Sequence, residues 1–165
     1  MAADKTVLIT GCSEGGIGFA LAKEFQSRGL RVFATARSPS KMAALEGLPG
    51  VTLLPLNVTS AESISATVDA VSAETGGKLD YLVNNSGVAY LMPLIDADIQ
   101  YAKDMYDVNV WGAVAMSKAF APLIIAAQGS IVNLSSIGTL VSQPYMGKSG
   151  LVHEPLSKLA ATSRS

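Results

Sequence analysis

The stretch that decides the fold is TVLITGCSEGGIGFALA, residues 6–22. A β-branched apolar run leads into a cluster of glycines, and apolar residues then recur four positions apart at Ile17, Leu21 and Phe25. This order predicts a buried strand, a glycine turn and a helix, as at the start of a nucleotide-binding βαβ unit. Glycines allow positive φ and let a pyrophosphate approach the backbone, where N–H groups at the helix N-terminus would face it. Because glycines also form ordinary loops, this interpretation needs support from the rest of the chain.

The composition is that of a globular domain. The chain has 165 residues, of which 49% are hydrophobic and 15% charged, so it can bury a core and is too apolar for a disordered chain. Its formal net charge of −1 argues against a nucleic acid or an anionic membrane surface as a partner. Cys12 is the single cysteine of this sequence, which suits a reducing compartment, and we expect a cytoplasmic location.

The longest apolar stretch, residues 110–127, is interrupted by Ser117, Lys118 and Pro122. A membrane-spanning helix needs about 20 predominantly apolar residues, so the pattern predicts a buried helix and no integral membrane span. We expect no secretory signal, because the apolar run 7–9 is short and leads directly into glycines.

Strands and helices are expected to alternate along the chain. The predicted strands are residues 6–10, 31–36, 51–54, 81–83 and 130–134. The predicted helices are residues 17–27, 40–46, 60–75 and, as two helices, 96–127. Most strands are unbroken apolar runs, which is typical of a parallel sheet covered on both faces. Right-handed crossovers then give the order 3-2-1-4-5, a doubly wound α/β sheet of the Rossmann type. We assign residues 1–147 to this dinucleotide-binding domain and residues 148–165 to a divergent polar tail.

Polar residues cluster where the predicted strands end. Besides the glycine loop after the first strand, Arg37, Asn57, the segment 84–87 and the pair Ser135-Ser136 follow the other four strands. The carboxyl ends of parallel strands meet at one edge of the sheet, and ligands bind there at the switch point, here between strands 1 and 4. The convergence of all five strand ends predicts a dinucleotide site more firmly than any single motif does.

The end of the second strand bears on which dinucleotide binds. An acidic residue at this point would accept hydrogen bonds from the adenosine 2′-hydroxyl and select NAD. Here the sequence is Thr35-Ala36-Arg37-Ser38, with Lys41 nearby and no carboxylate until Glu46. A guanidinium pairs bidentately with a 2′-phosphate, so we predict NADPH or NADP as the coenzyme, with Thr35 and Arg37 in its site. The alternative for Arg37 is a solvated surface charge beyond a strand.

The motifs that carry chemistry follow one another in a recognisable order. They are Thr10-Gly11 with Gly16-Ile17-Gly18, Asn57-Val58-Thr59, Asn84-Asn85-Ser86-Gly87, Asp107-Val108-Asn109-Val110-Trp111-Gly112 and Ile131-Val132-Asn133-Leu134-Ser135-Ser136. With these motifs the chain resembles the short-chain dehydrogenase/reductase family over about residues 6–136. Four residues separate Gly11 from Gly16 where the family usually has three. This longer loop and the segment 33–37 are similar to those of fungal NADPH-dependent acyl-dihydroxyacetone phosphate reductases and their relatives.

The resemblance implies a role for each matched position. The positions implied to hold the coenzyme are Gly11, Ser13, Gly16, Ile17 and Gly18 at the pyrophosphate, Asn57 and Val58 at the adenine, Asn84 at the ribose, and Gly87 at the nicotinamide end. Lys118 either lies near the coenzyme or belongs to a solvated helix face. Asn57 stands where the family usually has Asp, so the adenine contact is altered. Asn109 is implied to hold a water of the proton relay, and Ser136 to hydrogen-bond the substrate carbonyl oxygen and stabilise its developing negative charge.

The family's chemistry also uses a tyrosine and, four residues later, a lysine that lowers the pKa of the tyrosine. This sequence contains no such pair, since Tyr145 and Lys148 are three residues apart. The segment 157–161 resembles the family's lysine segment and makes Lys158 the candidate catalytic lysine, but Glu154 stands four residues before it. A solvated glutamate has a pKa of about 4.3 and is a poor proton donor at neutral pH.

These observations predict an NADPH-dependent oxidoreductase that transfers hydride between NADPH and a small carbonyl or alcohol substrate. One alternative is a catalytically impaired NADP-binding fragment or pseudoenzyme, and another is a product that does not fold stably alone. Family members continue through two further strands, so we expect a chain truncated at its C-terminal side that lacks the family's last strands. The resemblance also implies a homo-oligomer through the long helix around residues 109–127, whose apolar face could equally be core. A lipid-droplet or endoplasmic-reticulum surface is a further location that it implies.

Overall fold

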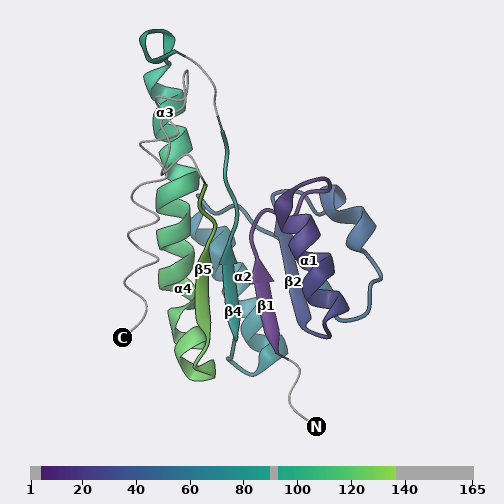
Figure 1. Ribbon diagram of the computed structural model, residues 1–165. Helices are drawn as coiled ribbons and strands as arrows, with labels where there is room; N and C mark the ends of the chain where they lie inside the picture. Colours follow the sequence, from purple (N-terminus) through teal and green to yellow (C-terminus); the bar gives the residue numbers. More distant parts are fainter. Residues whose placement is uncertain (1–4, 90–92, 137–165) are drawn as a thin grey trace.

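The computed structural model describes residues 5–89 and 93–136. Within this part of the chain, five strands form one parallel sheet in the order β3-β2-β1-β4-β5 (Figure 1). The strands are β1 Thr6–Ile9, β2 Arg31–Ala36, β3 Val51–Pro55, β4 Tyr81–Asn84 and β5 Ser130–Asn133. The predicted order and the doubly wound architecture are confirmed, and every strand end falls within one residue of its expected position.

Helical segments connect the strands. The α-helices are α1 Ile17–Ser27, α2 Ala61–Thr75, α3 Ile99–Tyr106 and α4 Ala113–Ala127. The 3-10 segments are η1 Pro39–Leu45 and η2 Leu94–Asp96, and η3 Asp107–Gly112 is a π-helical segment. The short helix expected at residues 40–46 is present as η1, which is 3-10 rather than α-helical and consists of two short turns that meet at Met42, where φ is −119°. So short a segment cannot offset the cost of nucleating an α-helix, and it folds as tighter turns against the sheet.

Helices cover both faces of the sheet, as the unbroken apolar strands predicted. On one face Leu8 and Phe33 pack with buried residues of α2 and α4, such as Phe120. On the other face Val7 and Ile9 pack with buried residues of α1 and η1. Successive strand residues point to opposite faces, so both sides of each central strand need apolar residues. Both faces of the sheet are therefore covered, and its carboxyl edge is left for the loops that follow the strands.

The long helical region after β4 is divided by η3. The expected two helices are present, and the π-helical segment joins them without a break in the helical run. Gly112 ends this segment in close contact with the loop after β3, where a Cβ would lie 2.8 Å from Val58 Cγ2. In Figure 1, α3 rises beyond the upper edge of the sheet, the edge at which the strands end. The division therefore brings residues 107–112 to the rim of the sheet.

The apolar face of α4 is core on one side and exposed on the other. Met116 and Phe120 are fully buried, whereas Ile125 is 76% exposed and Trp111, in η3, is 61% exposed. By length and composition the helical run Ile99–Ala127 could cross a membrane, but helices in the cores of soluble proteins meet the same criteria. Assembly through this helix stays a prediction. The division into a domain and a tail also stays a prediction, because residues 137–165 lie outside the described part of the chain.

Candidate functional site

A cleft of about 590 Å³ lies at the carboxyl edge of the sheet. Its lining comes from the segments that follow all five strands, from the start of α1 and from η3. The predicted site residues that line it are Gly11, Ser13, Gly16, Ile17, Arg37, Asn57, Val58, Asn84, Gly87 and Asn109. The topology therefore brings together loops as far apart in sequence as those that hold Gly11 and Ser135.

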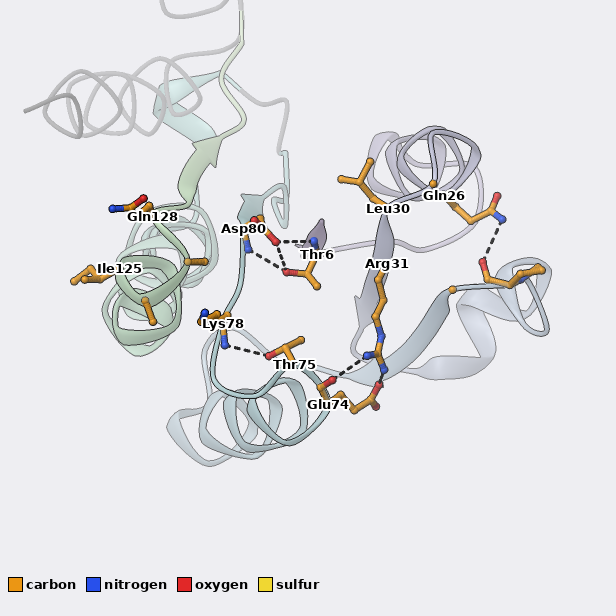
Figure 2. Close-up of a pocket in the computed structure, with 15 residues that line it drawn as sticks. Thr6, Gln26, Leu30, Arg31, Glu74, Thr75, Lys78, Asp80, Ile125 and Gln128 are labelled. Carbon is orange, nitrogen blue, oxygen red and sulfur yellow. Dashed lines mark hydrogen bonds and ion pairs between the residues drawn. The ribbon is translucent and has the colours of Figure 1, made fainter. Parts of the chain in front are cut away.

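A larger cavity, of about 1090 Å³, opens at the opposite edge, where the strands begin (Figure 2). Its polar groups are largely used by one another. Arg31 forms an ion pair with Glu74, and Asp80 accepts hydrogen bonds from Thr6 N at 2.8 Å and from Thr6 Oγ1 at 2.9 Å. The ion pair links the start of β2 to the end of α2, and the Asp80 contacts link the starts of β1 and β4. We therefore take the carboxyl-edge cleft as the candidate site.

The glycine turn after β1 forms a cradle that no larger residue could form. Gly11 has φ +76°, and a Cβ there would lie 3.0 Å from Ser86 Cα. A Cβ on Gly18 would lie 2.5 Å from Gly11 O and 2.5 Å from Asn85 Nδ2. Gly16 caps α1, and no side chain caps the first turn of that helix. The N–H groups at the start of α1 are thus left to an anion, and the cradle fits the pyrophosphate of a dinucleotide.

Thr10 fastens this turn to the loop after β4. Its buried Oγ1 accepts hydrogen bonds from Asn85 N at 2.9 Å and from Ser86 N at 2.8 Å. In the reverse direction, Asn85 Nδ2 donates to Thr10 O at 2.7 Å and to Gly11 O at 3.0 Å. Sequence reasoning missed this linking role of Thr10 and Asn85. The available signal was a polar residue directly after a buried apolar strand.

Asn84 and Asn109 hold the far side of the cleft. Asn109, in η3, clamps the backbone of Val88, since its Oδ1 accepts from Val88 N and its Nδ2 donates to Val88 O, both at 2.8 Å. Asn84 Nδ2 donates to Asn133 Oδ1 at 2.8 Å and to Ser117 Oγ at 3.2 Å. Asn84 Oδ1 is buried and has no partner among the described residues. A buried acceptor of this kind is stabilised by a donor, which a ligand hydroxyl in the cleft could provide.

Arg37 follows β2 and lines the cleft with an exposed side chain. None of the carboxylates in residues 5–89 and 93–136 forms an ion pair with it. Glu14, in the glycine turn, lines the same cleft, and sequence reasoning did not consider it. The turn is positioned by Glu14 N, which donates to Lys41 O at 2.8 Å, beside the end of β2. One cation and one carboxylate therefore face the cleft on this side.

A family model for short chain dehydrogenases matches residues 5–148. The chain belongs to the short-chain dehydrogenase family. Over 143 residues it is 49% identical to the short-chain dehydrogenase ptmH of Penicillium ochrochloron, and this match covers 87% of this chain and 53% of that relative. Over 141 residues it is 45% identical to the NADPH-dependent 1-acyldihydroxyacetone phosphate reductase of Schizosaccharomyces pombe, covering 86% of this chain and 47% of that one.

The structure is similar to the crystal structure of a short-chain dehydrogenase from Streptomyces avermitilis, with a TM-score of 0.87 and 27% sequence identity over 97% of this chain and 59% of that one. The resemblance drawn from the motifs is thus confirmed, and the chain is a member of an oxidoreductase family. It spans about half the length of the curated relatives it matches.

Some predicted site residues of this short-chain dehydrogenase do not line the cleft. Thr35 is fully buried, and its Oγ1 donates to Ile9 O at 3.0 Å while its carbonyl accepts from Cys12 N at 2.8 Å, so it supports the glycine turn from below.

Gly18 is buried in the first turn of α1, and Lys118 is exposed on α4. Ser135 lines the cleft and Ser136 follows it on the exposed rim. The roles of Ser136 and Lys118 stay predictions. Lys158, Tyr145, Lys148 and Glu154 lie outside the described residues.

Cys12 lies in the glycine turn, and its thiol is shielded from solvent. It is fully buried, and its Sγ donates to Ile9 O at 3.3 Å. Burial raises the pKa of the Cys12 thiol to about 12, against a smaller opposing effect of the Thr35 backbone. An unfolded thiol has a pKa of about 8.5, so this group's contribution to stability is complete below that pH and is lost as the pH rises towards 12.

We expect the native protein to be unreactive towards the thiol reagent DTNB at pH 8, because the attacking species is the thiolate. The same sample should release one equivalent of product per chain once guanidinium chloride unfolds it. Absorbance at the reagent's product band measures both. Reaction of the folded protein at the rate of a free thiol would contradict the buried position of Cys12.

Proposed function

We propose that this protein is an NADPH-dependent oxidoreductase that transfers hydride between NADPH and a small carbonyl or alcohol substrate. The single observation that carries the choice of coenzyme is the position of Arg37. Its guanidinium lines the cleft at the end of β2 and forms no ion pair with any of the described residues. A guanidinium matches a phosphate with two parallel hydrogen bonds. The name of the Schizosaccharomyces pombe relative, which is NADPH-dependent, supports the same choice.

The residues of this chain would divide the work around the coenzyme. The glycine turn would hold the pyrophosphate against the N-terminus of α1, and Asn84 Oδ1 would accept a hydrogen bond from the ribose on the β4 side. Asn109 would keep the loop at Val88 in place. Ser136 would donate a hydrogen bond to the substrate oxygen as negative charge develops on it. NADPH, when bound, supplies the hydride.

A second candidate is a dinucleotide-binding protein without turnover. It is favoured by one feature of the printed sequence, in which no tyrosine is followed by a lysine four positions later. Titration with NADPH, followed by nicotinamide fluorescence, tests the binding that both candidates share. Carbonyl-dependent oxidation of NADPH by the folded protein would support the first candidate, and binding without turnover would support the second. If the folded protein binds neither NADPH nor NADH at millimolar concentration, both are wrong.

Replacing Arg37 tests the choice of coenzyme directly. We expect Arg37→Ala to weaken NADPH binding by about tenfold while NADH binding changes little, because a hydrogen bond to a charged group contributes about 1.5 kcal/mol or more. Glu14→Gln removes a carboxylate from the same cleft and should strengthen NADPH binding, while Lys23→Ala on the exposed side of α1 should leave it unchanged. The ratio of the two dissociation constants is the measurement. An unchanged ratio in Arg37→Ala would remove the argument for NADPH.

A further inference from the structure

Asn84 ends β4 with a buried side chain that lines the cleft. Its amide nitrogen Nδ2 donates to Asn133 Oδ1, in β5, at 2.8 Å and to Ser117 Oγ, in α4, at 3.2 Å. Its amide oxygen Oδ1 has no hydrogen-bond partner within residues 5–89 and 93–136, although it is buried. The protein therefore holds one end of this amide and leaves the other end for a ligand.

The neighbours of Asn84 on α4 determine which end of its amide they contact. Ser117 Oγ donates its one proton to Ala113 O at 2.7 Å, so it can only accept a hydrogen bond from Asn84. Ala113 O lies 3.5 Å from the same amide atom and, as a carbonyl oxygen, also only accepts. Both groups need a nitrogen opposite them. The acceptor Oδ1 is therefore the end of the amide that α4 does not contact.

Asn133 supplies the shortest contact to this amide. It lies directly opposite Asn84 in the register of β4 and β5, so the two neighbouring strands bring both side chains to the carboxyl edge of the sheet. The terminal torsion of an asparagine side chain has only a broad preference of its own, so its neighbours have to fix the orientation of the amide. Without Asn133 Oδ1, one N–H group of a buried amide would lose its acceptor, and Asn84 could rotate away from its present orientation.

We propose that Asn133 is a positioning residue for the coenzyme, which holds the Asn84 amide so that Oδ1 accepts a hydrogen bond from a ribose hydroxyl. The inference rests on the proposed function, since it needs a nicotinamide dinucleotide in the cleft. Asn109 and Ser135 line the β4 side of the cleft, where the reacting half of the coenzyme would have to meet a substrate. With the pyrophosphate on the glycine turn, the ribose near Asn84 is that of the nicotinamide half.

Asn133→Leu removes the acceptor and keeps a side chain of similar size. We expect it to weaken NADPH binding by about fivefold, because the coenzyme loses the equivalent of one neutral hydrogen bond. Titration of the full chain, followed by nicotinamide fluorescence, measures this without turnover or substrate. Binding of adenosine 2′,5′-bisphosphate, measured by calorimetry, should stay unchanged, because this ligand has the adenosine half and no nicotinamide ribose. The second ligand distinguishes a loss of positioning from general damage to the cleft.

Asn133→Asp is the matched variant. It has the shape of asparagine, and its carboxylate oxygens accept hydrogen bonds, so the contact with Asn84 Nδ2 is kept. The added charge repels both anionic ligands, and the ratio of the two dissociation constants largely removes this effect. We expect the ratio of the NADPH constant to the bisphosphate constant to stay at the wild-type value in Asn133→Asp and to rise about fivefold in Asn133→Leu.

The outcomes separate the two proposals. If the wild-type chain binds NADPH and the folded Asn133→Leu variant keeps the wild-type ratio, the inference about Asn133 is wrong and the proposed function stands. The same conclusion follows if Asn133→Asp raises the ratio as much as Asn133→Leu does. Thermal melting establishes that each variant is folded, and Asn133→Ala replaces Asn133→Leu if the latter does not fold. If the folded wild-type chain binds neither NADPH nor NADH, both proposals are wrong.

Discussion

Thr10→Val is expected to lower the free energy of unfolding by about 3 kcal/mol, because it leaves the N–H groups of Asn85 and Ser86 without their acceptor. Each unsatisfied buried donor costs about 1–3 kcal/mol, whereas valine has nearly the shape of threonine and fills the same space. The variant also releases the glycine turn from the loop after β4, so NADPH binding should weaken with stability. Urea denaturation followed by circular dichroism measures the first effect, and NADPH titration measures the second.

Thr10→Ser is the matched control for this experiment. It keeps the hydroxyl that accepts both N–H groups and loses only a buried methyl, which costs about 1 kcal/mol. If Val and Ser at this position were equally destabilising, the two linking hydrogen bonds would contribute no more to stability than one buried methyl group does. The predicted difference in stability between Thr10→Val and Thr10→Ser is therefore due to the hydroxyl oxygen at this position.

Gly18→Ala should place a damaging methyl group directly beneath the cleft, inside the glycine turn. Its Cβ would lie 2.5 Å from Gly11 O and from Asn85 Nδ2, and the first of these is backbone that cannot rotate away. Forcing extra volume into a packed site costs about 1–3 kcal/mol, and here the turn that receives the pyrophosphate would have to move. We expect a loss of stability in this range and a more than tenfold weaker affinity for NADPH, about 1.4 kcal/mol of binding energy. Chemical denaturation and NADPH titration measure the two effects.

Gly87→Ala controls for the loss of a glycine as such. Its Cβ would meet Asn109 Oδ1 at 3.4 Å as the nearest atom, and its φ is not in the left-handed region, so its stability should stay within about 1 kcal/mol of wild type. Wild-type stability and NADPH affinity in Gly18→Ala would mean that the turn is wider than described.

The coarse fold followed from the sequence because its signals are local. Mostly apolar runs such as 6–9 and 31–36 favour a buried parallel sheet, and glycine or proline follows soon after each of them. The polar residues of the cleft were predicted for the same reason. In a doubly wound sheet, the residue after each strand lies at the carboxyl edge whatever the intervening helix contains.

Finer features depend on segments that are distant in sequence. Residues 40–46 form the expected short helix, but their short length and their contact with the sheet give them 3-10 turns. The side chain of Thr35 faces the core and donates to Ile9 O, a contact that the sequence did not indicate, and its place in the coenzyme site stays a prediction. Glu14 was not considered, although the turn brings it into the cleft on the side of Arg37.

By itself, the sequence determined the strand order and the family, because these depend on periodicity and on motifs read along one segment at a time. Only the tertiary structure decided how individual polar atoms are used. Thr10 Oγ1 accepts two N–H groups from a loop 75 and 76 residues away, and Asn109 hydrogen-bonds both the N–H and the carbonyl of Val88. A hydrogen bond depends on distance and direction between atoms, and those are defined only once the whole chain has packed.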